Sequence, residues 1–231
     1  MLSSERHAAP GRPRRASRYS VAMPDPLLPL PPQAFHFVLG HETRALIRPV
    51  RASDVPYFVR GYSTLSAESR HLRFFSQAAE LSAKQLAFFT QLDHVKHEAW
   101  GALDLREKEP VGIGVARYIG LMERPGVAEV ALTIVDRYQN IRAGTLLHAC
   151  LHLTASRHGY RTFVYDVLLD NQKFLRYLKA LGGRVVGSES NVATLEMPVY
   201  ARGRDVPVEN GTALRFAQLM NDVMIAPPVA V

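Results

Sequence analysis

The segment VDRYQNIRAGTLLHACL, residues 135–151, decides the fold that this sequence predicts. It joins a strand-like alternation to a helical pattern that begins near Gly144. The first turn of a helix has unpaired backbone N–H groups and a partial positive charge, and phosphate binds readily there. Gly144 has no Cβ, so a ligand can approach its backbone closely. The segment is therefore either a phosphate-binding loop or an ordinary strand-to-helix turn that needed one glycine.

An arginine, Arg142, lies two residues before this glycine. It can keep an ordinary negative φ and extend its side chain to a phosphate group. Alternatively, the position needs a positive φ or a close approach, and the Cβ of Arg142 blocks the ligand. We favour the first alternative, binding with altered geometry, because Gly144 and the helix dipole are retained.

The hydrophobic periodicity on either side of this segment predicts the remaining elements. Ser53 and Asp54 can cap the first helix, and Ser82 can cap a later one. In chain order we expect a strand at 45–49, helices beginning near 55, 66 and 82, strands at 97–105, 109–119 and 128–135, a helix at 144–158, a strand at 162–169, a helix at 171–183, and strands at 183–190 and 192–200. This order predicts an α/β fold, a mixed sheet with helices on both faces.

The organisation of the chain follows from its composition. Residues 1–34 are rich in arginine and proline and read as a disordered tail. Residues 35–200 form the expected domain, and 201–231 form a C-terminal extension. The extension contains a short amphipathic helix at 212–224, which packs either on the domain or on a second subunit.

The charge is concentrated at the N-terminus. Of the net charge of +7, residues 1–18 carry +4 (five arginines against Glu5), which leaves about +3 for the remainder. A nucleic-acid-binding protein that works through this arginine tail is one function class to consider. Such proteins interleave aromatic residues with basic ones, and only Tyr19 lies among these. We therefore expect no nucleic-acid partner.

Other composition features narrow the function classes further. No apolar run approaches the ~20 residues of a membrane-spanning helix, so we expect a cytoplasmic protein that is not embedded in a membrane. Cys150 is the only cysteine and lies among helical leucines, which indicates a buried core residue without a disulfide.

Histidine-containing clusters give little sign of a metal site. Asp93, His94 and His97 have no accompanying ligand cluster, so we expect no metal and instead expect these residues to border an acceptor site. His148 and His152 lie four residues apart on a helix, without a matching carboxylate or cysteine. We expect them to face solvent.

The loop sequence carries a family resemblance. Gln139–Thr145 reads QNIRAGT and resembles Q-x-x-G-x-G/A, the acetyl-CoA-binding motif of the GNAT acetyltransferase superfamily. The glutamine and the last glycine match, whereas Arg142 stands in place of the first glycine. The resemblance extends from about residue 43 to 199. Similarity to bacterial Pat-type protein-lysine acetyltransferase domains extends over residues 64–76, 81–86, 91–100, 110–119, 128–139 and 171–182.

The resemblance implies a particular architecture and cosubstrate. The sheet would be mainly antiparallel, with a V-shaped split between two central strands. The pantetheine arm of acetyl-CoA would lie in the split and pair with the backbone of Ile134 and Val135. The pyrophosphate would rest on the backbone amides of Arg142, Ala143, Gly144 and Thr145, with Gln139 hydrogen-bonded to the loop or the ligand. Asn171 would either contact the cosubstrate arm or serve only as a helix N-cap.

The resemblance also implies that Glu129 is the general base. An amine is mostly protonated near neutral pH and must lose a proton before it attacks the thioester. Glu129 shares a strand face with Ala131, Thr133 and Val135, and the first two are small enough to leave room for a substrate. Alternatively, Glu129 is a solvent-exposed strand-end residue or pairs with Arg117.

Many GNAT enzymes protonate the leaving thiolate with a tyrosine on the late helix. This chain has Leu178 at that register, and the adjacent Tyr177 points about 100° away around the helix.

Three functions follow from these features. The leading one is an N-acetyltransferase that uses acetyl-CoA and acts on a protein lysine or a small-molecule amine. The second is a catalytically silent acyl-CoA-binding or regulatory domain, and the third is the nucleic-acid-binding protein already considered. Whether the protein is a monomer or a homodimer stays open.

Overall fold

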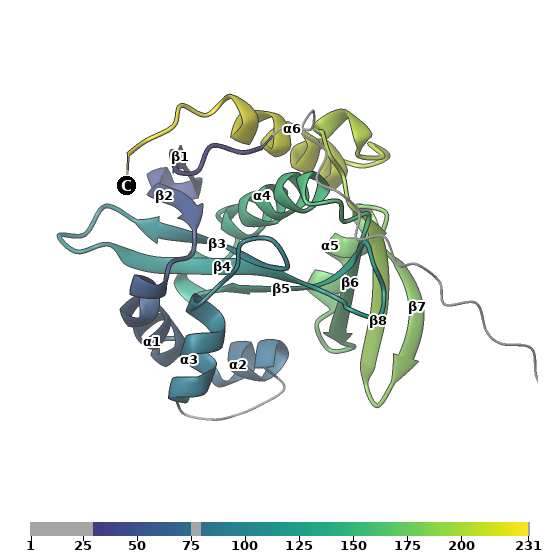
Figure 1. Ribbon diagram of the computed structural model, residues 1–231, viewed down its shortest axis with the longest axis horizontal. Helices are drawn as coiled ribbons and strands as arrows, with labels where there is room; N and C mark the ends of the chain where they lie inside the picture. Colours follow the sequence, from purple (N-terminus) through teal and green to yellow (C-terminus); the bar gives the residue numbers. More distant parts are fainter. Residues whose placement is uncertain (1–29, 75–79, 231) are drawn as a thin grey trace, which may run out of the picture.

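The computed structural model describes residues 30–74 and 80–230 and shows one eight-stranded sheet with helices on both faces (Figure 1). The strands are β1 (Phe35–Val38), β2 (Arg44–Pro49), β3 (His97–Asp104), β4 (Val111–Gly120), β5 (Val127–Ile134), β6 (Thr162–Leu168), β7 (Arg184–Glu189) and β8 (Val192–Pro198). The α-helices are α1 (Val55–Ser63), α2 (Ala67–Phe74), α3 (Ala83–Thr90), α4 (Ala143–Arg157), α5 (Gln172–Ala180) and α6 (Gly211–Ile225). Short 3-10 turns occupy Gly40–Glu42, Ala52–Asp54, Asp136–Tyr138 and Gly203–Asp205.

The sheet has the order β1-β2-β3-β4-β5-β6-β8-β7, and only β5 and β6 are parallel neighbours. Their pairing covers three positions and ends at Glu129 opposite Val164. Both strands continue beyond this point, to Ile134 and Leu168. The two central strands therefore separate beyond Glu129, which confirms the expected V-shaped split.

Helix α4 lies between the sheet and α6 and forms the centre of the core (Figure 1). Leu147, Cys150 and Leu151 are fully buried on it, which confirms the expected burial of Cys150. His148 and His152 are also fully buried, so the expectation that they face solvent is wrong. Neighbouring elements cover α4 on both sides and leave these two positions no exposed face.

Helix α6 packs against α4 within the same chain. The ring of Phe216 lies 5.4 Å from that of His148 and 5.2 Å from that of His152, centroid to centroid. Of the two alternatives for the C-terminal amphipathic helix, packing on the domain is the one observed.

The start of the fold differs from expectation in two places. Strand β1 was not predicted, although it pairs with β2 over four positions. Asp54 lies at the N-cap position of α1 but accepts no capping hydrogen bond from that helix. Its carboxylate instead forms a buried bidentate pair with Arg48, at 2.6 and 2.7 Å.

Ser82 caps α3 as predicted. Residues 1–29 of the expected tail, and residues 75 and 76 of the predicted second helix, lie outside the described residues. Within the described ranges, no helix has the length and apolar character needed to cross a membrane.

Candidate active site

The loop between β5 and α4 is held by contacts with distant parts of the chain. The Asp136 carboxylate accepts hydrogen bonds from the backbone N–H of Ser66 (3.0 Å) and from the hydroxyls of Ser66 (2.9 Å) and Ser69 (2.7 Å). Burial alone would raise the pKa of Asp136, but these hydrogen bonds outweigh it, and the pKa is lowered. The carboxylate thus fixes the start of the loop against the N-terminus of α2.

The other side of the loop is fixed in the same way. The Tyr138 hydroxyl donates to the buried Asp104 carboxylate at 2.9 Å, and the backbone N–H of Gly40 donates to the Ile141 carbonyl at 3.1 Å. A Cβ built on Gly40 would lie only 3.1 Å from the Ile141 Cα, so the two backbones approach closely. The loop therefore has a defined shape before any ligand binds.

Arg142 adopts the left-handed conformation, with φ +72° and ψ +4°, at the N-cap position of α4. The expectation that it keeps a negative φ is wrong. The chain must turn sharply here to bring Ala143 into the first turn of α4, and a positive φ achieves this turn. The Arg142 side chain is exposed, so its guanidinium is accessible from solvent.

The first turn of α4 has no side-chain cap among the described residues. In contrast, Ser82, Asn171 and Asn210 each accept a backbone N–H at the start of α3, α5 and α6. The first backbone hydrogen bond of α4 runs from the Leu146 N–H to the Arg142 carbonyl. The N–H groups that precede it, at 143–145, are thus available to an anionic ligand.

Successive backbone N–H groups of β5 point alternately toward β4 and toward the split. The Val135 N–H donates to the Ile113 carbonyl at 2.9 Å, toward β4. Because N–H direction alternates along a strand, those of Leu132 and Ile134 point away from β4, into the split. Side chains alternate as predicted: Ile134 lies near Gly144 of α4, whereas Thr133 lies on the opposite face.

Glu129 is exposed at the point where the split opens. It lies opposite Ile119 of β4 and Val164 of β6, at the last paired position between β5 and β6. No hydrogen bond or ion pair joins it to another described residue. Arg117, the alternative partner, contacts the Phe89 carbonyl and His97 instead.

Helix α5 borders the other side of the split. The Asn171 side chain accepts from the Phe174 N–H at 3.2 Å, so it serves as the N-cap of this helix. The Lys173 ammonium donates to the Asn140 side chain of the loop. Leu178 occupies the position of the tyrosine that protonates the thiolate in many GNAT enzymes, and it is fully buried.

Tyr177, beside Leu178, is turned toward α4. Its hydroxyl lies 2.9 Å from His148 Nδ1, and the Tyr165 hydroxyl lies 2.7 Å from Nε2 of the same ring. Complete burial lowers the pKa of His148 to about 3, so the ring is neutral. Tyr177 thus belongs to a buried hydrogen-bond chain.

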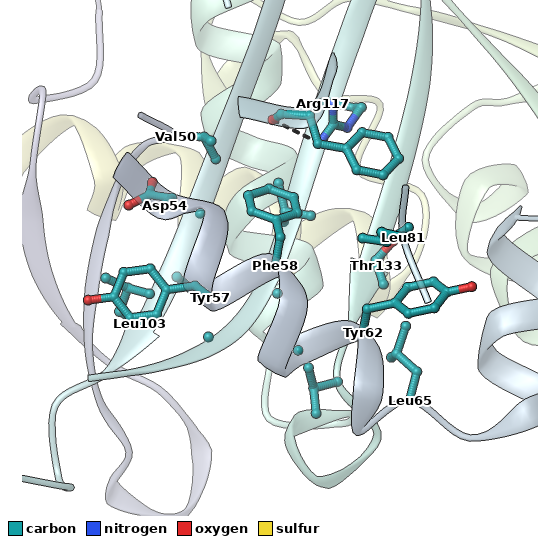
Figure 2. A pocket seen from close by; sticks show the side chains of 18 of the residues that line it. Val50, Asp54, Tyr57, Phe58, Tyr62, Leu65, Leu81, Leu103, Arg117 and Thr133 are labelled. Atoms are coloured by element: carbon teal, nitrogen blue, oxygen red, sulfur yellow. Dashed lines mark hydrogen bonds between the residues drawn. The ribbon is translucent and has the colours of Figure 1, made fainter. Parts of the chain in front are cut away.

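A pocket lies between α1 and the sheet, on the face that carries Thr133 (Figure 2). It encloses about 750 Å³ of empty space, including the part open to solvent. Tyr57, Phe58 and Tyr62 project from α1 over the strands, and Leu103 lies at the Tyr57 end. Most of its wall is apolar.

The Asp93 cluster has a structural role. Its carboxylate accepts three backbone N–H groups, from Val95, Lys96 and His97, at 2.8–2.9 Å. Burial, with Arg117 nearby, lowers the pKa of His97 to about 4. The described residues contain no group of three potential metal-ligating side chains.

The sequence analysis did not predict two features of the site. The hydrogen bond between Asp136 and Ser66 joins residues 70 positions apart, and no local pattern signals it. The pocket under α1 depends on small residues on different elements, including Gly61, Gly101 and Gly112. Each of these reads in isolation as an ordinary glycine.

Comparison with known proteins supports the resemblance to the GNAT acetyltransferase superfamily. The chain is 33% identical to acetyltransferase PA5475 of Pseudomonas aeruginosa over 116 residues, which cover 50% of this chain and 62% of that protein. It is 31% identical to acetyltransferase Pat of Mycolicibacterium smegmatis over 157 residues, 66% of this chain and 45% of that protein. The chain thus spans less than two thirds of either relative. No protein-family model matches it.

The solved structure of the GNAT domain of S. lividans PAT has the same fold. It superposes with a TM-score of 0.65 at 27% sequence identity, over 72% of this chain and 97% of that one. The strand–loop–helix segment and the split between β5 and β6 therefore lie in a fold shared with a GNAT domain. By fold and by sequence likeness, the chain is similar to acetyltransferases of the GNAT superfamily, and among them to the Pat-type proteins.

Proposed function

We propose that the protein transfers the acetyl group of acetyl-CoA to an amine. The observation that carries this proposal is the arrangement of the split: the uncapped first turn of α4 lies at its open end, and Glu129 lies at its apex. One end suits a phosphate, and the other presents a carboxylate where the thioester would react.

The residues of the split suit the cosubstrate. The N–H groups of Ala143, Gly144 and Thr145 bind the pyrophosphate, and the exposed Arg142 guanidinium adds a charge-assisted contact. The pantetheine arm pairs with the Ile134 N–H. Val135 contributes packing rather than a donor, because its N–H is already bonded to β4.

Further contacts complete the cosubstrate site. Gln139, whose amide lies 3.4 Å from the Ser69 hydroxyl, supports the loop beneath the phosphates. Asn171, besides capping α5, lies beside the path of the arm. No metal takes part in this mechanism.

Glu129 accepts the proton that the substrate ammonium must lose, directly or through water. The neutral nitrogen forms a bond to the thioester carbonyl carbon, and the carbon–sulfur bond breaks. The nitrogen releases its second proton to solvent as the thiolate of CoA leaves, and the thiolate takes a proton from solvent, since Leu178 offers none. The products are an amide and free CoA.

Likeness to the Pat type favours a protein lysine as the acceptor, with a small-molecule amine as the second choice. The exposed position of Glu129 supports this preference, because a lysine on a partner protein reaches an exposed carboxylate without entering the fold.

Two observations favour a second function, that of a catalytically silent acyl-CoA-binding or regulatory domain. Arg142 occupies a left-handed position where the superfamily motif has glycine. The thiolate-protonating tyrosine is replaced by the buried Leu178.

The test begins with titration of acetyl-CoA into the purified chain by calorimetry. We expect binding in the micromolar range, and no binding at millimolar acetyl-CoA would refute the proposal. Thiol release with a panel of lysine-containing peptides then measures turnover. We expect Glu129→Gln to lower turnover by about 10² or more with little change in affinity.

Glu123→Gln, an exposed glutamate in the turn before β5, is the matched control and should keep full turnover. If Glu129→Gln also turned over normally, Glu129 would have no catalytic part. Tight binding without turnover on any acceptor would favour the silent domain.

A further inference from the structure

The pocket beneath α1 is a slot formed by small residues. Gly61 of α1 faces the strands, and Gly101 of β3 and Gly112 of β4 lie across from that helix. A Cβ built on Gly61 would lie 3.8 Å from Val135 Cγ2, and, apart from its chain neighbours and the backbone of its own helix, no other described atom lies within 4 Å of it. The space between helix and sheet therefore exists because these positions lack side chains.

The charged groups of the slot do not suit an ammonium ion. Its lining includes one carboxylate, that of Asp54, which is held by Arg48 through two hydrogen bonds and also accepts the Arg51 N–H. Arg117 adds a second positive charge, with its guanidinium 4.5 Å from the Phe89 ring centroid. The carboxylate of Asp54 is thus already paired, and most of the remaining wall is apolar, which favours an uncharged hydrocarbon occupant over a protonated amine.

The slot also reaches the strand that borders the split. Thr133 and Val135 of β5 line it, and Thr133 shares the strand face of Glu129. A thioester arm that runs from the first turn of α4 back along β5 passes Thr133 before it reaches Glu129. An acyl tail attached at the thioester carbonyl therefore enters the β5 end of the slot only by turning back from Glu129 toward Thr133, along the strand face that the two residues share.

We propose that this slot binds the hydrocarbon tail of an acyl group longer than acetyl, so that the preferred donor is a medium-chain acyl-CoA. The inference rests on the proposed function. The reaction is otherwise unchanged: the amine nitrogen bonds to the acyl carbonyl carbon, the carbon–sulfur bond breaks, and the amine proton goes to Glu129. The products are a longer amide and free CoA.

The dimensions set the expected chain length. Thr133 on β5 is in register with Gly101 on β3 through Val115 of β4, and this two-strand separation corresponds to about 10 Å across the sheet. This span accommodates a chain of about six carbons. Each methylene that enters the slot should tighten binding by about threefold to fourfold, and the gain should stop when the chain exceeds the slot.

The experiment is a calorimetric series of acetyl-, butanoyl-, hexanoyl- and octanoyl-CoA against the full chain. We expect affinity to rise from acetyl to hexanoyl. Gly61→Leu, which fills the slot from the helix side, should abolish this dependence on chain length. Val59→Leu, at an exposed position on the same helix, should retain it.

Gly61→Ala is the second variant and should reduce, but not abolish, the dependence of affinity on acyl-chain length. Thermal unfolding checks that each variant folds. A flat series in the parent chain, with acetyl-CoA still bound, would overturn this inference and leave the proposed function standing. An unchanged dependence on chain length in folded Gly61→Leu would also overturn it. So would a Gly61→Leu variant in which only the KM for the acceptor rises, because the slot would then belong to the acceptor. If no CoA thioester binds, the proposed function fails with it.

Discussion

At the residue scale, Arg142 has an exposed side chain and a backbone in the unfavourable left-handed conformation. A residue with a Cβ in the left-handed region costs roughly 1–2 kcal/mol. Asn140, two residues earlier, also has a positive φ, of 65°, but asparagine tolerates this region better than arginine does. The loop therefore contains local strain, which the contacts of Asp136, Tyr138 and Ile141 hold in place.

We expect Arg142→Gly to raise the free energy of unfolding by about 1 kcal/mol, because glycine adopts φ +72° without a steric cost. Arg142→Ala is the matched control: it also lacks the guanidinium but keeps the Cβ, and it should give no such gain. Urea unfolding measures both. Equal stabilities for the two variants would show that the Cβ causes no strain.

At the element scale, α4 depends on α6 for its burial. The sheet covers one side of α4, and the apolar side of α6 covers another (Figure 1). The first turn of α4 supplies the amides that we propose to bind the pyrophosphate, so the packing of its later turns positions the proposed site.

We expect Phe216→Ala to lower the free energy of unfolding by about 3–5 kcal/mol, because Phe216 is fully buried against the rings of His148 and His152. Leu214→Ala, on the same helix but 46% exposed, should change it by no more than about 0.5 kcal/mol. Chemical denaturation compares them. Similar losses for the two would indicate that α6 does not pack on α4 in solution.

At the scale of the whole molecule, two neutral histidines lie in the core. Burial lowers the pKa of His148 to about 3 and lowers that of His152 as well, with His148 adding to the effect. In the unfolded chain a histidine titrates near 6.5. Below that pH the unfolded state binds protons that the folded state does not, so acid favours unfolding.

We expect the free energy of unfolding to fall as the pH drops from about 6.5 toward 3, by up to about 1.4 kcal/mol per pH unit for each buried histidine. Urea unfolding between pH 7 and pH 5 measures the slope. His148→Gln should reduce this slope as well as the stability at pH 7, whereas His36→Gln, exposed on β1, should leave it unchanged. An unaltered slope in folded His148→Gln would show that His148 is protonated in the fold.

Much of the architecture was readable in the sequence, because periodicity reports local geometry. The alternation along β5 placed Thr133 and Ile134 on opposite faces, and the strand–loop–helix order around Gly144 located the uncapped helix start. The capping pattern at Ser82 correctly marked the start of α3. These features depend on residues within a few positions of one another.

By itself, then, the sequence determined the order of the elements after β1, the likeness to the GNAT superfamily and the position of the loop. Only the tertiary structure decided the burial of His148 and His152, the positive φ of Arg142, and the slot opposite Gly61. Each of these depends on which surfaces meet: α6 covers α4, Asp136 binds a serine 70 residues away, and α1 lies across glycine-bearing strands. Such contacts follow from packing of the whole chain, which no local pattern encodes.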